Sequence, residues 1–193
     1  MESRSGKPRL PRATELAHRF VTECLGPGDR AIDATAGNGH DTLFLAELVG
    51  PEGKVVAFDV QPEAIEATRA RLEAGGVADR VRLVRECHSR LADSIEGEWN
   101  AVMFNLGYLP GGDKATITRP ETTLAAMEAA LKVLAPRGRM MVVVYPGHPG
   151  GEVEAEMVER WAAELDQARF SVASYGFLNQ TNSPPRLVVI EKR

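Results

Sequence analysis

The sequence predicts an α/β fold in which a mostly parallel sheet is covered by helices on both faces. Short apolar segments alternate with longer amphipathic segments along most of the 193-residue chain, and this alternation is typical of parallel strands joined by helices. The last two apolar segments, Phe170–Leu178 and Arg186–Glu191, have no helical segment between them. We therefore expect seven strands, of which the last two form an antiparallel hairpin.

The first half of the chain supplies three strands and three helices. Thr14 can cap the first helix, which Gly26 and Pro27 end. Pro62 suits the first turn of a later helix, and Gly75 ends that helix. The expected segments are the helix Thr14–Leu25, the strand Arg30–Thr35, the helix Asp41–Leu48, the strand Lys54–Val60, the helix Pro62–Ala74 and the strand Val81–Cys87.

The second half continues the alternation. A loop rich in glycine and proline, Gly107–Asp113, interrupts it after the fourth strand, and Pro136 closes the helix that follows the loop. The expected segments are the helix His88–Ile95, the strand Ala101–Leu106, the helix Glu121–Leu134, the strand Gly138–Tyr145, the helix Gly151–Ala168 and the final hairpin.

Composition indicates one domain over residues 14–193, preceded by a flexible basic segment at residues 1–13. Apolar residues make up 44% of the chain and charged residues 26%, which excludes a disordered protein and a disulfide scaffold. The apolar runs are too short to span a membrane. Cys24 and Cys87 have no metal-site spacing, so we expect a cytoplasmic protein with reduced cysteines and no metal.

The charge distribution is uneven. The net charge is −4, which by itself disfavours a nucleic-acid partner. Residues 1–12 hold four basic residues and one acidic residue, a balance of +3, so the remainder carries −7. Several acidic residues cluster in the expected helix Gly151–Ala168, and we expect them to lie on a solvated back face.

The loop after the first strand has the features of a cofactor site. It reads Asp33-Ala34-Thr35-Ala36-Gly37-Asn38-Gly39-His40-Asp41, and glycines at such a point let a ligand approach the backbone. Asp59 follows Gly39 by twenty residues, at the end of the second strand, where a carboxylate can accept both hydroxyl groups of a ribose. Gln61 is then placed to reach the base, and His88 follows the third strand.

Two cofactor classes use this layout. A dinucleotide-binding oxidoreductase places a third glycine where this chain has Thr42, and Asp41 would repel a pyrophosphate. Asp33 and Asp41 suit the sulfonium and ammonium groups of S-adenosylmethionine, and the pattern is similar to the first motif of class I methyltransferases. Helix capping is the structural alternative for both carboxylates.

The loop after the fourth strand is the candidate catalytic segment. Ligands bind beyond the carboxyl ends of parallel strands where the strand order reverses, so Asn105 and Tyr108 should face the cofactor loop. Asn105-Leu106-Gly107-Tyr108 resembles the Asn/Asp-Pro-Pro-Tyr/Phe motif of amine methyltransferases, although both prolines are absent. An amide can orient an amine for methyl transfer, and an aromatic ring can stack on a base. A turn with a core tyrosine is the alternative.

Two later segments should reach the same edge of the sheet. Tyr145 and His148 follow the fifth strand, and Asn179 lies in the last hairpin. His148 can bind a phosphate or accept a proton. The alternative is that these residues belong to surface loops and have no role in binding or catalysis.

Taken together, these strings resemble the MnmM-type tRNA methyltransferases, formerly described as rRNA methylases. The resemblance covers about residues 14–192, and its most specific part is the run Asn105–Lys114. It implies a Rossmann-like class I fold, S-adenosylmethionine as cofactor, and methylation of 5-aminomethyl(-2-thio)uridine at the tRNA wobble position. It assigns cofactor binding to Asn38, Asp41, Asp59, Gln61 and His88.

The resemblance also suggests the substrate side of the site. Asn105, Tyr108 and Asp113 are the expected catalytic residues. The residues expected to bind the cofactor also include Asp33, Thr35, Gly37 and Gly39 of the first loop, and Asn105. The expected substrate contacts are Leu106, Gly107, Tyr108, Pro110, Gly111, Lys114, Tyr145, His148 and Asn179.

Several alternatives stay open at the level of sequence. Another RNA, a small-molecule amine, an oxidoreductase or a non-catalytic RNA-binding module would use the same fold. The general base is Asp113, Tyr108, His148 or water. The candidate RNA contacts are Lys114, Arg119, Arg186 and the basic N-terminal segment. The expected partner is the anticodon stem-loop of tRNA. A homodimer would widen the surface available to that partner.

Overall fold

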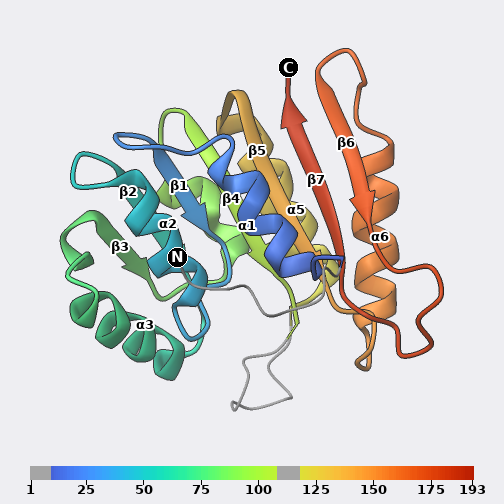
Figure 1. Ribbon diagram of the computed structural model, residues 1–193, viewed down its shortest axis with the longest axis horizontal. Coiled ribbons are helices and arrows are strands. Elements are labelled where there is room, and N and C mark those ends of the chain that lie inside the picture. The colour runs from blue at the N-terminus through green and yellow to red at the C-terminus, as the bar shows by residue number, and fades with distance from the viewer. Residues whose placement is uncertain (1–9, 108–117) are drawn as a thin grey trace, which may run out of the picture.

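A computed structural model of the chain describes residues 10–107 and 118–193. Its centre is a seven-stranded sheet in the order β3-β2-β1-β4-β5-β7-β6 (Figure 1). β7 pairs antiparallel with both β5 and β6, and the other pairings are parallel. The strands are β1 Arg30–Asp33, β2 Lys54–Phe58, β3 Val81–Val84, β4 Trp99–Asn105, β5 Leu134–Val144, β6 Phe170–Tyr175 and β7 Arg186–Lys192.

Helices cover both faces of the sheet. One face packs on α1 (Ala13–Thr22), α2 (His40–Val49) and α3 (Pro62–Ala74), which lie in front in Figure 1. The opposite face packs on α4 (Leu91–Ser94), α5 (Pro120–Val133) and α6 (Gly151–Ala163). Two short 3₁₀ helices, η1 (Ala78–Arg80) and η2 (His88–Arg90), precede β3 and α4.

The core alternates between the two faces, as the pleat of a sheet requires. Ala31 belongs to the cluster beneath α1–α3, whereas the next residue, Ile32, belongs to the cluster beneath α4–α6. Met103 and Phe104 of β4 divide in the same way. A sheet buried on both faces explains why the central strands are nearly continuous apolar runs. The expected fold class is confirmed.

Several element ends differ from the sequence prediction. The expected strands Arg30–Thr35, Lys54–Val60 and Val81–Cys87 end earlier, because their last residues turn out of the sheet into the loops above it. The first helix begins at Ala13, not at Thr14, and the carboxylate of Glu15 accepts the backbone N–H of Arg12 at its start. The expected helix His88–Ile95 divides into η2 and α4.

Two differences arise from local side-chain and backbone features. α6 ends at Ala163, not Ala168, because a turn follows in which the side chain of Asp166 accepts the backbone N–H of Ala168. β5 begins at Leu134, before Pro136, and its pairing with β4 shifts register between Trp99 and Ala101. Arg137 has a positive φ of 63° at this irregularity.

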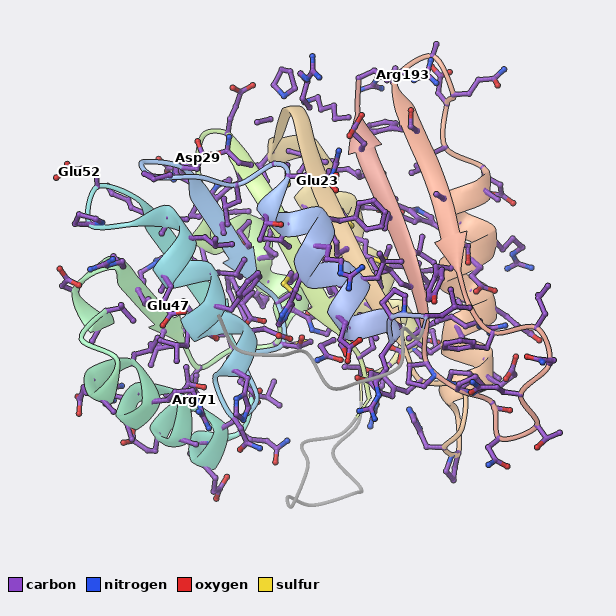
Figure 2. The ribbon with its side chains drawn as sticks, viewed as in Figure 1. Glu23, Asp29, Glu47, Glu52, Arg71 and Arg193 are labelled. Atoms are coloured by element: carbon purple, nitrogen blue, oxygen red, sulfur yellow. The ribbon has the colours of Figure 1, made fainter. Side chains whose placement is uncertain are left out.

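Charged side chains lie mostly on the outside of this framework. Figure 2 places Glu23, Asp29 and Glu52 at the end of the molecule where β1 and β2 begin. Most acidic residues of α6 are solvated as expected, but Glu154 is buried at 3% exposure, which corrects the expectation of a uniformly solvated acidic face.

No helix among residues 10–107 and 118–193 is long and apolar enough to cross a membrane. The expected flexible segment falls largely on residues 1–9, which lie outside the described residues.

Candidate active site at the carboxyl ends of β1 and β4

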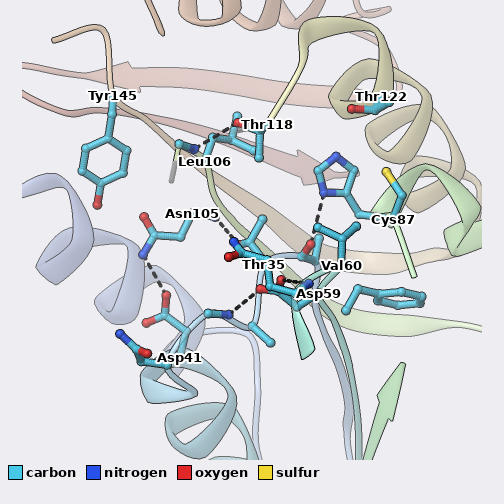
Figure 3. Close-up of a pocket in the computed structure, with 18 of the residues that line it drawn as sticks. Thr35, Asp41, Asp59, Val60, Cys87, Asn105, Leu106, Thr118, Thr122 and Tyr145 are labelled. Atoms are coloured by element: carbon cyan, nitrogen blue, oxygen red, sulfur yellow. Dashed lines mark hydrogen bonds between the residues drawn. The ribbon is translucent and has the colours of Figure 1, made fainter. Parts of the chain in front are cut away.

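A cavity of about 700 Å³ opens at the carboxyl ends of β1 and β4, the neighbouring strands at which the strand order reverses. Residues from both loops line it (Figure 3). The expected site residues among its lining are Thr35, Gly37, Asn38, Asp41, Asp59, Gln61, His88, Asn105, Leu106, Gly107, Tyr145 and His148.

Other expected site residues take different places. Asp33 and Gly39 are buried and Asn179 is exposed on the last hairpin, and none of the three lines the cavity. From that hairpin it is Ser183 that does so. Five more expected residues lie outside the described residues: Tyr108, Pro110, Gly111, Asp113 and Lys114.

Asp59 is held as a rigid acceptor. Its Oδ2 accepts the backbone N–H of Gly37 at 2.9 Å, and its Oδ1 accepts the backbone N–H of Gln61 at 2.9 Å. Each carboxylate oxygen has a second lone pair, so both oxygens can still accept a hydroxyl group from a ligand. This geometry fits recognition of a ribose diol.

Asp33 supports the cofactor loop from behind. Its Oδ2 accepts the hydroxyl of Thr42 at 2.6 Å and its Oδ1 accepts the backbone N–H of Thr35 at 3.1 Å. Burial, together with the charge of nearby Asp41, raises the pKa of Asp33 to about 7. Asp33 is buried and does not line the cavity, so its hydrogen bonds stabilise the loop, and the expected contact with the cofactor stays a prediction.

Gly39 shapes the loop and does not line the cavity, so its expected role in cofactor binding stays a prediction. It has a φ of 77°, and a Cβ at this position would come within 2.8 Å of the backbone of Thr68. The hydroxyl of Thr68 donates to the carbonyl oxygen of Gly37 at 3.0 Å. The glycine therefore permits α3 to pack against the loop, and this contact places Gly37 and Asn38 along the cavity.

Asp41, Asn105 and Tyr145 form a polar row on one side of the cavity (Figure 3). The side-chain amide of Asn105 donates to Asp41 Oδ2 at 3.1 Å, and the backbone N–H of Asn105 donates to the hydroxyl of Thr35 at 2.7 Å. Since Asp41 can only accept, the amide nitrogen must face it, and the amide oxygen faces the hydroxyl of Tyr145 (Figure 3).

The electrostatics of this row keep Tyr145 neutral. Burial and the negative charge of Asp41 raise the pKa of Tyr145 to about 12. The neutral phenol can donate a hydrogen bond to the amide oxygen of Asn105, toward which it points (Figure 3).

His88 presents a hydrogen-bond acceptor to the cavity. Its Nδ1 lies 3.2 Å from the carbonyl oxygen of Ala34, which can only accept, so Nδ1 carries the hydrogen. Burial lowers the pKa of His88, which keeps the ring neutral. Its Nε2 is buried and has no hydrogen-bond partner within the described part of the chain, so a ligand donor can satisfy it.

Sequence reasoning missed several residues around the site. Glu86 and Cys87 line the cavity beside His88. Thr118 lines it from the segment that leads into α5, and Thr122 lines it from the first turn of α5. Such residues lack a motif of their own, and only the packing of distant segments brings them here. In the described ranges 10–107 and 118–193, no group of three or more His, Cys, Asp or Glu side chains could hold a metal ion.

These residues fit S-adenosylmethionine. The orphaned acceptor of His88 suits the amino group of an adenine, the rigid carboxylate of Asp59 suits a ribose, and Asp41 suits a cationic amino-acid moiety. An acidic loop at this position would repel a pyrophosphate. The fold and the site together define a class I S-adenosylmethionine-dependent methyltransferase.

Comparison with known proteins identifies the family. Residues 55–191 match the family model described as "Putative rRNA methylase". A chloroplastic tRNA (mnm5s2U34)-methyltransferase from Arabidopsis thaliana is 41% identical over 94% of this chain and 70% of the plant protein. The chain belongs to this rRNA methylase family, which excludes the oxidoreductase alternative.

Solved structures agree with this assignment. The crystal structure of a protein from Clostridium thermocellum, described as a "putative rRNA-methylase", has a TM-score of 0.94 and 41% identity, and the match covers 96% of this chain and all of that one. A protein from Streptococcus mutans, described as "a putative methyltransferase" and crystallised in complex with SAH (S-adenosylhomocysteine), has a TM-score of 0.88, 41% identity and the same coverage.

Proposed function

We propose that the protein transfers a methyl group from S-adenosylmethionine to the amine of 5-aminomethyl(-2-thio)uridine at the tRNA wobble position. The product is 5-methylaminomethyl(-2-thio)uridine. The similarity to the plant tRNA methyltransferase supports the substrate, because it extends over 94% of this chain. The amide of Asn105, fixed at the cavity wall by Asp41, carries the chemical argument.

The reaction needs a positioned, uncharged amine. When bound, S-adenosylmethionine supplies a methyl group on a sulfonium; the amine lone pair forms the new N–C bond while the electrons of the broken S–C bond go to sulfur. The amide oxygen of Asn105 can accept an N–H of the amine and aim its lone pair. Positioning of this kind accounts for several kcal/mol of a barrier, about 7 kcal/mol or more in well-oriented systems.

The methylated amine carries an extra proton, which must leave. Of the candidate bases, His148 lines the cavity, and Tyr108 and Asp113 lie outside the described residues. Water is the remaining candidate. A pH–rate profile of the His148→Gln enzyme tests whether this imidazole takes the proton.

The proposed partner is the anticodon stem-loop of tRNA, and the proposed location is the cytoplasm. Among the expected basic contacts, Arg119 is exposed and directly follows Thr118, which lines the cavity. Arg186 is less available, because its guanidinium lies 3.3 Å from Glu152 and 3.2 Å from Glu159. RNA binding that depends on few basic residues should weaken steeply with added salt. A homodimer would add a second basic surface.

The proposal is tested with labelled S-adenosylmethionine and three RNAs. These are tRNA carrying 5-aminomethyluridine at the wobble position, the same tRNA with unmodified uridine, and ribosomal RNA, which the family description names. We expect label only in the first, recovered as 5-methylaminomethyluridine. Label in ribosomal RNA, or none in the modified tRNA, would overturn the proposed substrate.

A further inference from the structure

His18 of α1 contacts the site without lining it. Its Nε2 lies 2.7 Å from Oδ1 of Asp41, although the two residues are far apart in the sequence. Its ring stacks on Phe44 with a centroid distance of 4.0 Å and an interplanar angle of 12°. His18 is absent from the cavity lining, so its effect on the site must pass through Asp41.

The contact has a defined direction. An ionised carboxylate only accepts hydrogen bonds, so Nε2 of His18 carries the hydrogen and donates it. Phe44 and Asp41 lie three residues apart on α2 and therefore on the same face of that helix. One side of α2 thus fixes both the plane of the imidazole and the atom toward which it points.

This contact orients the rest of the polar row. With Oδ1 of Asp41 engaged by His18, Oδ2 accepts the amide of Asn105 at 3.1 Å. The amide oxygen of Asn105 is then directed toward Tyr145 (Figure 3). A carboxylate free to rotate would not favour this one orientation of the amide.

We propose that His18 is a positioning residue for methyl transfer. It holds the Asp41 carboxylate, and through it the Asn105 amide, in the orientation that binds the cofactor and aims the amine. The cofactor part of this inference rests on the methyltransferase class, and the amine part rests on the proposed function.

The test separates the hydrogen bond from the ring. Glutamine at this position can donate from its Nε2 but cannot stack on Phe44, whereas leucine retains an apolar contact and donates nothing. The exposed neighbour Arg19, changed to glutamine, is the matched control on the same helix. Thermal unfolding of each variant reports whether it folds, and His18→Asn, which has a shorter reach, substitutes for His18→Leu if that variant does not fold.

The measurements are the Kd of S-adenosylhomocysteine by calorimetry and the kcat and KM of methyl transfer. We expect His18→Leu to weaken binding and lower kcat by about 10- to 100-fold, as loss of a hydrogen bond to a charged group implies. His18→Gln should stay within about threefold of the wild type, as should Arg19→Gln. Equal losses in His18→Gln and His18→Leu would overturn the proposal, because the ring alone would then matter.

The two proposals fail in different ways. If wild-type protein does not methylate the modified tRNA, the proposed function is wrong, and the binding series still tests the role of His18. If wild-type protein is active and His18→Leu has unchanged Kd and kcat, the function stands and the positioning role is wrong.

Discussion

The buried carboxylate of Glu154 accepts a 2.6 Å hydrogen bond from the hydroxyl of Thr118. Its other oxygen accepts the hydroxyl of Thr123 at 2.7 Å. Thr118 is in turn joined to Gly107, because the N–H of Gly107 donates to the Thr118 hydroxyl at 3.0 Å and the N–H of Thr118 donates to the Gly107 carbonyl at 3.1 Å. Glu154 of α6 thus holds Thr118 directly and Gly107 through Thr118, and both of these residues line the cavity.

Replacing Glu154 with alanine should therefore destabilise the fold and impair the site. The buried hydroxyl of Thr123 and the half-buried hydroxyl of Thr118 would lose their acceptor, and each unsatisfied buried group costs about 1–3 kcal/mol. We expect a loss of roughly 2–4 kcal/mol in the free energy of unfolding, measured in urea. Glu156→Ala, an exposed change on the same helix, is the control and should leave the free energy nearly unchanged. A loss of equal size in both variants would show that the helix, and not the buried carboxylate, is responsible.

The chemical role of Asn105 is tested by a pair of substitutions. Asn105→Ala removes the amide, and we expect kcat to fall about 100-fold while S-adenosylhomocysteine still binds. Asn105→Asp retains the shape but places a second carboxylate beside Asp41, so cofactor binding should weaken as well. Steady-state kinetics and calorimetry measure the two effects. An Asn105→Ala enzyme with normal kcat would rule out this amide as the positioning group.

Much of the fold follows from local patterns. The alternation of strands and helices predicts a parallel sheet, and the absence of a helix before Arg186 predicts the antiparallel β7. The ends of β1, β2 and β3 are not predictable in this way. Thr35 and Val60 are of residue types common in strands, but these segments turn away to form the cavity wall, as the hydrogen bond from Ala36 N–H to the Phe58 carbonyl illustrates.

The residues of the site were predictable only where they belong to a recognisable sequence motif. Asp59 and Asn105 follow from their positions after strands, and both line the cavity. His18 and Glu154 have no such signal, since each acts through a contact with a residue distant in sequence. The burial of Asp33 was not predictable, because a carboxylate in a glycine loop looks the same in sequence whether it faces the cavity or the core.

The protonation state of His88 predicts how cofactor binding responds to pH. Burial lowers its pKa from the ordinary value of 6.5, so Nε2 should remain an acceptor as the pH falls through 6.5. Affinity for S-adenosylhomocysteine should thus be nearly constant from about pH 8 to pH 6.5 and decline only under more acidic conditions. Calorimetry across this range is the measurement, and His88→Phe, which has no acceptor, should bind about tenfold more weakly at neutral pH. Wild-type affinity in His88→Phe would show that Nε2 does not contact the cofactor.

The raised pKa of Asp33 predicts an unusual dependence of stability on pH. Its pKa is about 7 in the folded protein and near the ordinary 3.8 in the unfolded chain. Between these two pH values the folded protein retains a proton that the unfolded chain has lost. A rise in pH therefore destabilises the fold, and this loss of stability is constant above pH 7.

The substitution Asp33→Asn tests this dependence. Asparagine at position 33 is neutral at every pH, and the hydroxyl of Thr42 can turn to accept a hydrogen bond from its amide nitrogen. Relative to the wild type, the unfolding free energy of Asp33→Asn should therefore increase from about pH 4 to pH 7 and then level off. Urea unfolding at several pH values provides the comparison, with the exposed change Glu47→Gln on α2 as a control that lacks this trend. Parallel curves for Asp33→Asn and wild type would mean that folding does not raise the pKa of Asp33.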